Sequence, residues 1–260
     1  MTKHLLSILL FIFYAGFALA QSNSPKKFSF SISAGPAFPV GVFAKKDMEN
    51  AVIYFPDSSI PNMANILKSN NGFAQVGFSF HGALNYKFSN HFYTFIRAGI
   101  TSNSISVAEM DDFVNKLYGV EWRFSHVNNN LFTITPGLGY TLQKANWEYR
   151  AGIFLGYGQI NYPYYEMVRG LGNERLKWAH SGPRPNLHSL ASGGTIQVSR
   201  KIGKLNIGLE MLFQQADFEY SIFPKTSPGG SQSETYDDRI KARILTLGLL
   251  FSYNFSSPKK

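Results

Sequence analysis

The sequence predicts an all-β protein, an eight-stranded antiparallel up-and-down transmembrane β-barrel. Three observations predict this fold. The chain opens with an export signal, its apolar and polar residues alternate over many segments, and the connections between these segments are alternately long and short. A strand with lipid on one side and a filled interior on the other shows such alternation for about ten residues.

Residues 1–20 predict a cleaved signal peptide. Lys3 and His4 form a basic start, residues 5–17 are almost wholly apolar, and Ala18-Leu19-Ala20 places small residues where a signal peptidase cuts, before Gln21. The apolar run is too short for a membrane-spanning helix, which needs about 20 residues. Because no Cys follows the cleavage site, a lipoprotein anchor is excluded. We expect a single β-barrel domain over residues 21–260.

Composition excludes several classes of protein. The chain has no Cys, which rules out a disulfide scaffold, a thiolate metal site and a Cys nucleophile. Aromatic residues make up 15% and charged residues only 16%, where ordinary soluble domains have roughly 25% charged residues. The net charge of +9 is carried by scattered residues, so we expect no nucleic-acid partner, but attraction to anionic lipid headgroups or lipopolysaccharide phosphates.

The alternation defines the strands one by one. In the first, Phe28 and Phe30 face one side, and Ser29 and Ser31 face the other. Neighbouring side chains of a strand point to opposite faces, so the apolar set faces lipid and the small or polar set faces the interior. Six segments alternate clearly, at 28–41, 74–88, 131–142, 147–158, 205–214 and 245–255. Two alternate less regularly, at 91–102 and 189–202.

The lengths of the connections support an even strand count. Long connections are expected at 42–73, 103–130, 161–188 and 215–238, and they alternate with short ones at 89–90, 143–146 and 203. Bacterial barrels have short periplasmic turns and long external loops, so both termini are expected in the periplasm.

One segment at 118–126 does not fit this scheme. Tyr118 and Trp122 alternate with polar or small residues, and Asn128-Asn129-Asn130 could form a tight turn. We interpret the segment as an external extension of the hairpin of the fourth strand. The alternative is a ten-stranded barrel with a further strand hidden in 42–73.

Two stretches resemble a known group. Residues 33–43 (SAGPAFPVGVF) and 247–255 (LGLLFSYNF) resemble the small outer-membrane β-barrel domain proteins common in Bacteroidota, and the architecture is similar to the eight-stranded transmembrane domain of the OmpA/OmpX class. The resemblance implies that Leu249, Phe251, Tyr253 and Phe255 are read by the barrel-assembly machinery. The tail at 256–260 departs from the pattern, in which the aromatic residue is usually the last.

Charged residues on the inward face are the main candidate site. They are Arg97, Glu148, Arg150, Lys201, Glu210, His81 and Lys87. Side chains just fill the interior of an eight-stranded barrel, and buried charges must be paired or hydrogen-bonded. We therefore expect a plug in which Glu148 and Glu210 pair with the cations. A narrow polar pore, helped by inward glycines, is the alternative.

Other chemistry has little support in the sequence. Ser125-His126 and His188-Ser189 are adjacent pairs outside any nucleophile motif, and the six His lack metal-ligand spacing, so no catalytic residue, metal or cofactor is expected. The external loops carry Tyr54-Phe55-Pro56, Tyr162-Pro163-Tyr164-Tyr165 and Trp178, which could bind an envelope protein, a glycan or lipopolysaccharide, or could only cap the barrel mouth. The sequence thus favours a non-enzymatic structural or surface-interaction role, then a narrow channel, then a lipid-modifying enzyme.

Overall fold

The computed structural model describes residues 27–54, 64–118, 122–124, 128–161, 167–169, 175–176, 186–222 and 236–255. The signal peptide predicted at 1–20 and the tail at 256–260 lie outside these residues. Among the helices in the described part of the chain, none is long and apolar enough to cross a membrane.

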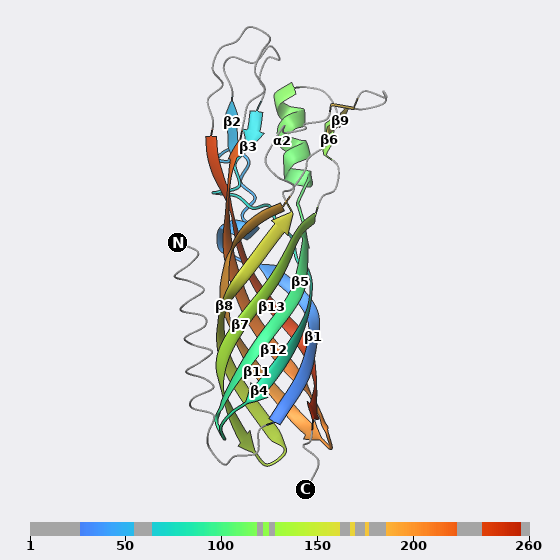
Figure 1. Ribbon diagram of the computed structural model, residues 1–260. Coiled ribbons are helices and arrows are strands. Elements are labelled where there is room, and N and C mark those ends of the chain that lie inside the picture. The colour runs from blue at the N-terminus through green and yellow to red at the C-terminus, as the bar shows by residue number, and fades with distance from the viewer. Residues whose placement is uncertain are drawn as a thin grey trace.

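Eight long strands form a closed antiparallel ring (Figure 1). They are β1 (Lys27–Pro39), β4 (Gly77–Lys87), β5 (Phe92–Ser104), β7 (Asn128–Lys144), β8 (Trp147–Asn161), β11 (Asn186–Ile202), β12 (Leu205–Ile222) and β13 (Tyr236–Phe255). Each strand pairs with its neighbours in the chain, and β1 pairs with β13 to close the ring, with Phe28 opposite Phe255. The predicted eight-stranded up-and-down barrel is confirmed, and the ten-stranded alternative is excluded.

The two ends of the barrel differ. At one end, here called the turn end, Ala145-Asn146 and Gly203-Lys204 make tight turns, and the paired ends of β1 and β13 lie at the same level. Ala145 and Gly203 both have positive φ values, as two-residue hairpin turns require. The described parts of the long connections lie at the opposite end, here called the loop end (Figure 1).

The barrel is apolar outside and mostly polar inside. Alternate residues of every barrel strand expose large apolar side chains, which we call the apolar belt: Phe28, Phe30, Phe78, Phe80, Leu84, Ile96, Ile100, Ile134, Leu138, Ile153, Leu155, Leu190, Ile196, Leu205, Leu209, Leu247, Leu249 and Phe251. The intervening residues point into the lumen and are buried, as Ser29, Ser31 and Ser33 are on β1. This is the reverse of a water-soluble barrel, where a continuous exposed apolar surface of this size is not found.

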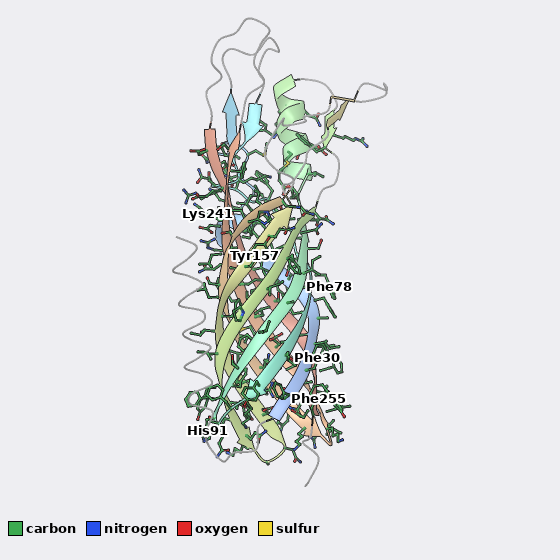
Figure 2. All side chains as sticks on the ribbon, in the orientation of Figure 1. Phe30, Phe78, His91, Tyr157, Lys241 and Phe255 are labelled. Atoms are coloured by element: carbon green, nitrogen blue, oxygen red, sulfur yellow. The ribbon has the colours of Figure 1, made fainter. Side chains whose placement is uncertain are left out.

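Aromatic pairs concentrate near the turn end of the belt. Phe28 packs on Tyr86 with ring centroids 4.8 Å apart, and Tyr140 contacts both His91 and Phe92 at 5.5 Å. In Figure 2, His91 and Phe255 mark this level of the barrel, while Tyr157 and Lys241 lie towards the loop end. Aromatic side chains with polar edges are typical of the boundary between hydrocarbon and water.

The loop end carries small elements outside the barrel. They are the 3₁₀ helix η2 (Gly41–Ala44), the pair β2 (Val52–Tyr54) and β3 (Ala64–Ile66), the helix α2 (Ala108–Tyr118), and a sheet of β6 (Trp122–Phe124), β9 (Met167–Arg169) and β10 (Arg175–Leu176). The segment at 118–126 therefore contributes the end of a helix and a strand that pairs with β9, outside the barrel ring.

Several expected boundaries differ from the structure. The prediction of a tight turn at Asn128-Asn129-Asn130 is wrong, because these residues begin β7 and pair with β5. Pairing between β12 and β13 continues to Ile222 opposite Tyr236, so these strands occupy much of the range assigned to a loop at 215–238. Helix α2 was not expected within 103–130.

A lid, residues 40–51 and 67–76, covers the loop end of the lumen. Its Phe43 and Phe73 are fully buried, and Phe43 packs with Phe218, Ile240 and Ile244 of the barrel. The two halves of the lid are joined by backbone hydrogen bonds, from Phe73 N to Lys45 O at 3.0 Å and from Ala74 N to Phe43 O at 3.0 Å. The mouth of the lumen is therefore closed by an apolar core.

Candidate functional site in the barrel lumen

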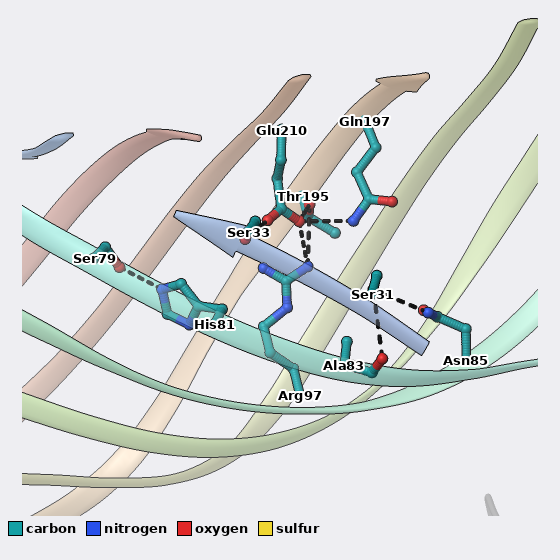
Figure 3. A network of polar contacts seen from close by, with 10 residues as sticks. All are labelled: Ser31, Ser33, Ser79, His81, Ala83, Asn85, Arg97, Thr195, Gln197 and Glu210. Atoms are coloured by element: carbon teal, nitrogen blue, oxygen red, sulfur yellow. Dashed lines mark hydrogen bonds and ion pairs between the residues drawn. The ribbon is translucent and has the colours of Figure 1, made fainter. Parts of the chain in front are cut away.

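A buried ion pair occupies the middle of the lumen. Arg97 of β5 donates to Glu210 of β12 across the interior, and each residue is only 3% exposed. Glu210 also accepts hydrogen bonds from Thr195 and Gln197 of β11, both at 2.7 Å, and from Ser33 of β1. Figure 3 shows these donors converging on the carboxylate from three strands, β1, β5 and β11. A buried carboxylate with this many donors is a satisfied charge.

A second ion pair lies nearer the turn end. Arg150 and Glu148 point inward from the same strand, β8, with Nη2 and Oε2 3.1 Å apart. Glu148 also accepts from Asn206 Nδ2 at 2.6 Å and from Thr141 Oγ1 at 3.2 Å. The guanidinium of Arg150 stands 5.5 Å from the centre of the Tyr93 ring, within the range of a cation–π contact.

His81 belongs to a third group of polar contacts, towards the loop end. Its Nε2 lies 2.5 Å from Ser79 Oγ, which is in turn 2.8 Å from Thr101 Oγ1. Gln214 Nε2 donates to the same Thr101 oxygen at 2.9 Å. These contacts link β4, β5 and β12 across the lumen.

Two of the predicted lumen charges lie elsewhere. Lys201 is exposed at the turn end, where its backbone N–H donates to Asn146 O at 2.7 Å. Lys87 is half-buried at the end of β4. The alternating pattern assigns both residues to the inward face, but both lie near the end of the barrel, where the lumen opens to solvent. The plug therefore consists of Arg97 with Glu210 and Arg150 with Glu148.

Aromatic rings fill the space beside two of the inward glycines, Gly137 and Gly139. A Cβ added to Gly137 would lie 2.3 Å from the Phe95 ring, and one added to Gly139 would lie 2.4 Å from the Tyr93 ring. Tyr93 and Phe95 form a buried cluster with Phe154 and Leu212, and the Arg97 guanidinium lies 5.8 Å from the centre of the Phe95 ring. These glycines make room for large side chains, so they do not indicate a water-filled pore.

The remaining candidate residues are distributed as follows. Leu249, Phe251, Tyr253 and Phe255 all point outward from β13 and are exposed. His188 Nδ1 lies 2.5 Å from Tyr157 Oη, whereas Ser189 Oγ donates to the backbone oxygen of Asp217, so the two have different partners. Ser125-His126 lies outside the described residues, as do residues 55–63, Tyr162-Pro163-Tyr164-Tyr165 and Trp178.

The sequence did not single out Asp238, which anchors the lid. Its carboxylate accepts the backbone N–H groups of Lys68 at 2.6 Å and Ser69 at 2.8 Å, and also the Tyr220 hydroxyl. Asp238 had been assigned to the end of a loop. The alternation of buried residues 238, 240, 242 and 244 along β13 was the signal that could have placed it inside.

The fold and its interior define a closed eight-stranded barrel with an apolar exterior and an ion-paired polar plug. No protein-family model and no curated protein sequence matches this chain. Among solved structures, it is similar to Neisserial surface protein A (NspA), with a TM-score of 0.40, 11% identity, and 89% of this chain and 98% of the other covered. It is also similar to Ail of Yersinia pestis, with a TM-score of 0.39, 12% identity, and 89% of this chain and 100% of the other covered. For E. coli Outer Membrane Protein W the TM-score is 0.34, the identity is 11%, and 90% of this chain and 100% of the other are covered. Similarity at this level does not identify what the chain binds.

Proposed function

We propose that this chain is a non-enzymatic outer-membrane barrel that spans the bilayer with its eight strands and interacts with other molecules through its loop end. The apolar belt supports membrane residence, because a closed barrel satisfies all its backbone hydrogen bonds between strands and can expose apolar side chains to hydrocarbon. The loop end would face outwards and the turn end, with both termini, would face the periplasm, because bacterial barrels place their short turns there.

The single observation that carries a non-conducting role is the environment of Glu210. Its carboxylate pairs with Arg97 and receives three further hydrogen bonds from β1 and β11, so the ion pair bridges the lumen at mid-height. The aromatic cluster of Tyr93, Phe95 and Phe154 fills the adjacent space, and the lid closes the loop end. A lumen filled in this way serves to hold the barrel together.

The loop-end elements support an interaction role. Helix α2 is tied to β6 by Asp111, whose Oδ1 accepts the Phe124 N–H at 2.7 Å, and to the lid by the ion pair of Lys46 with Glu109 at 3.2 Å. Such contacts give an ordered surface beyond the belt. Its partners would be lipopolysaccharide or an envelope or extracellular protein, and the outward aromatic residues of β13 would be recognised by the assembly machinery, as in the Bacteroidota proteins that the sequence resembles.

Conductance in planar bilayers tests the non-conducting role. We expect the reconstituted wild-type protein to give no discrete openings, and Lys201→Ala, whose side chain lies outside the plug, to behave identically. Discrete wild-type openings that are lost in Glu210→Ala or changed in Arg97→Ala would instead establish a narrow channel. A lipid-modifying enzyme would be established if the purified protein hydrolysed lipid A or transferred its acyl chains, and if His188→Ala or His126→Ala abolished that activity.

A further inference from the structure

A hollow of about 470 Å³ lies on the outside of the barrel, within the apolar belt. Its lining includes Leu138, Ala151, Ile153, Gly194, Phe213 and Leu245, which all point away from the lumen. Gly194 and Ala151 form its floor because they have little or no side chain. A Cβ added to Gly194 would meet only Gly152 O, at 3.4 Å, so the space above this glycine is open.

The hollow follows one row of paired residues across five strands. Leu138 lies opposite Ile153, Ile153 opposite Gly194, Gly194 opposite Phe213, and Phe213 opposite Leu245. Strands in a barrel are tilted, so a row perpendicular to them climbs relative to the barrel axis. Leu138 lies in the turn-end half of β7, whereas Leu245 lies halfway along the longer β13. The hollow is therefore an oblique groove that rises towards the loop end at Leu245.

Polar donors stand at the raised end of this groove. The next row of lipid-facing residues towards the loop end contains Arg243 of β13, Gln215 of β12 and Ser192 of β11, which are paired across the strands. Gln215 Nε2 donates to Ser192 Oγ at 3.3 Å. In the following row towards the loop end, Lys241 lies opposite Asp217, and an Asp217 carboxylate oxygen lies 2.7 Å from Arg243 Nη1. Two cations and one carboxylate thus leave a net positive charge where the apolar belt ends, at the level of Lys241 in Figure 2.

We propose that this groove binds one membrane lipid with a phosphate-bearing headgroup. One acyl chain would lie over Gly194 and Ala151, packed between Ile153 and Phe213, and the phosphate would contact Arg243 and Lys241. An apolar groove that ends at two cations and two neutral donors complements an acyl chain joined to an anionic headgroup. The proposal rests on the membrane residence argued above, since only a belt in contact with lipid would meet this ligand.

Native mass spectrometry of the detergent-solubilised barrel provides the test. The protein is titrated with phosphatidylglycerol or with a galactosyl diacylglycerol of matched chains, which lacks a phosphate, and the dissociation constant of the first bound lipid is measured. We expect the phospholipid to bind more tightly than the galactolipid. Arg243→Gln and Lys241→Gln should each raise the dissociation constant of the phospholipid by about fivefold and leave that of the galactolipid unchanged. Gly194→Leu should weaken both lipids by the same factor, because its side chain fills the groove.

Matched controls lie elsewhere on the same belt. Gly82 is an outward glycine of β4, where an added Cβ meets only the Phe30 ring at 3.8 Å, and Arg200 is an exposed cation at the turn end. Gly82→Leu and Arg200→Gln should leave both dissociation constants unchanged. Three outcomes would overturn the proposal. The two lipids could bind equally, Gly194→Leu and Gly82→Leu could have equal effects, or millimolar inorganic phosphate could displace the lipid. Those outcomes would not contradict membrane residence. A barrel that is monomeric in water without detergent would contradict both membrane residence and the lipid site.

Discussion

The buried carboxylates of the lumen, Glu210 and Glu148, lie where several side chains donate to them. Glu210 and Arg97 lie in the lumen with four strands supplying partners, while Lys201 occupies an equivalent inward position but reaches solvent at the turn end. Desolvation of an ion costs several kcal/mol, which the donors around the Glu210 carboxylate offset. Arg97 Nε and Nη1 have no hydrogen-bond partner among the described residues, and the guanidinium instead lies 5.8 Å and 6.0 Å from the centres of the Phe95 and Phe154 rings. The distance of a residue from the barrel end therefore decides whether an inward charge needs a partner.

Lys68 in the lid is a buried cation of a different kind. It is 2% exposed, its Nζ lies 5.4 Å from the centre of the Phe73 ring, and burial lowers the pKa of its amine to about 7, although the nearby Asp238 carboxylate opposes this shift. In an open lid the amine would regain the ordinary pKa of 10.5. The closed lid then binds fewer protons than the open lid between these two values, so closure becomes more stable as the pH rises through that range.

Hydrogen exchange of the lid measures this effect. We expect the protection factors of the Phe73 and Ala74 amides, corrected for intrinsic exchange, to rise by up to about tenfold per pH unit between pH 7 and 10. Lys68→Met removes the titrating group and should flatten this dependence. A wild-type profile that is flat, or one that Lys68→Met leaves unchanged, would show that the lid does not depend on this amine.

Period-two alternation was enough to assign residues to the inside or the outside, but not to identify their partners. Arg97, Glu148 and Glu210 could be placed in the lumen from the sequence, because alternation fixes the face of each strand residue. The donors Ser33, Thr195 and Gln197 approach Glu210 in two ways. Ser33 lies on β1, which is neither next to β12 in the chain nor paired with it, whereas Thr195 and Gln197 lie on the neighbouring strand β11, whose register places Gln197 opposite Glu210. Asp238 was missed because the strand that carries it was expected to begin later.

At the scale of the element, the barrel strands were predictable and the loop-end elements were not. The six clear strands and the two irregular ones all occur, because each one exposes an apolar face over most of its length. Strands β12 and β13 run past the belt, where outward residues such as Asp217 and Lys241 are polar and the lipid-facing pattern disappears. Helix α2 had one local signal, the Ser106-x-x-Glu109 spacing of a capping box, and the two side chains are hydrogen-bonded.

The final strand offers a test of the assigned faces. Leu249 points outward from β13, is 59% exposed and pairs with the equally outward Leu209, whereas Asn254 lies at the turn end, where its Nδ2 approaches Asn206 Oδ1 at 3.3 Å. We expect Leu249→Arg to lower the free energy of unfolding in lipid by ~2–4 kcal/mol, because the charge would lie in hydrocarbon. Asn254→Arg, near water, should cost less. Urea titration of protein reconstituted in lipid vesicles measures both, and equal tolerance would contradict the assigned faces.

At the scale of the whole molecule, two different environments hold one ring of strands in place. Outside, the belt is compatible with hydrocarbon and tolerates small residues such as Gly194, because lipid can fill the space above them. Inside, Gly137 and Gly139 face the Phe95 and Tyr93 rings, and a Cβ added to Gly139 would lie 2.4 Å from Tyr93. The same substitution should therefore destabilise the barrel on the inner surface and have little effect on the outer one, since an interior at close-packed density cannot accept additional methylene groups.

Heat-modifiable migration on gels provides this comparison for the intact barrel. We expect the unboiled wild-type protein to migrate faster than the boiled protein, because a closed barrel without free strand edges stays folded in the sample buffer. Gly139→Leu drives a side chain into the Tyr93 ring, and overpacking of this kind costs about 1–3 kcal/mol, so the temperature at which the fast band disappears should fall. Gly194→Leu places the same side chain on the belt and should leave that temperature close to the wild-type value. Similar shifts for both variants would mean that the two surfaces are packed alike, which a lipid-facing exterior does not allow.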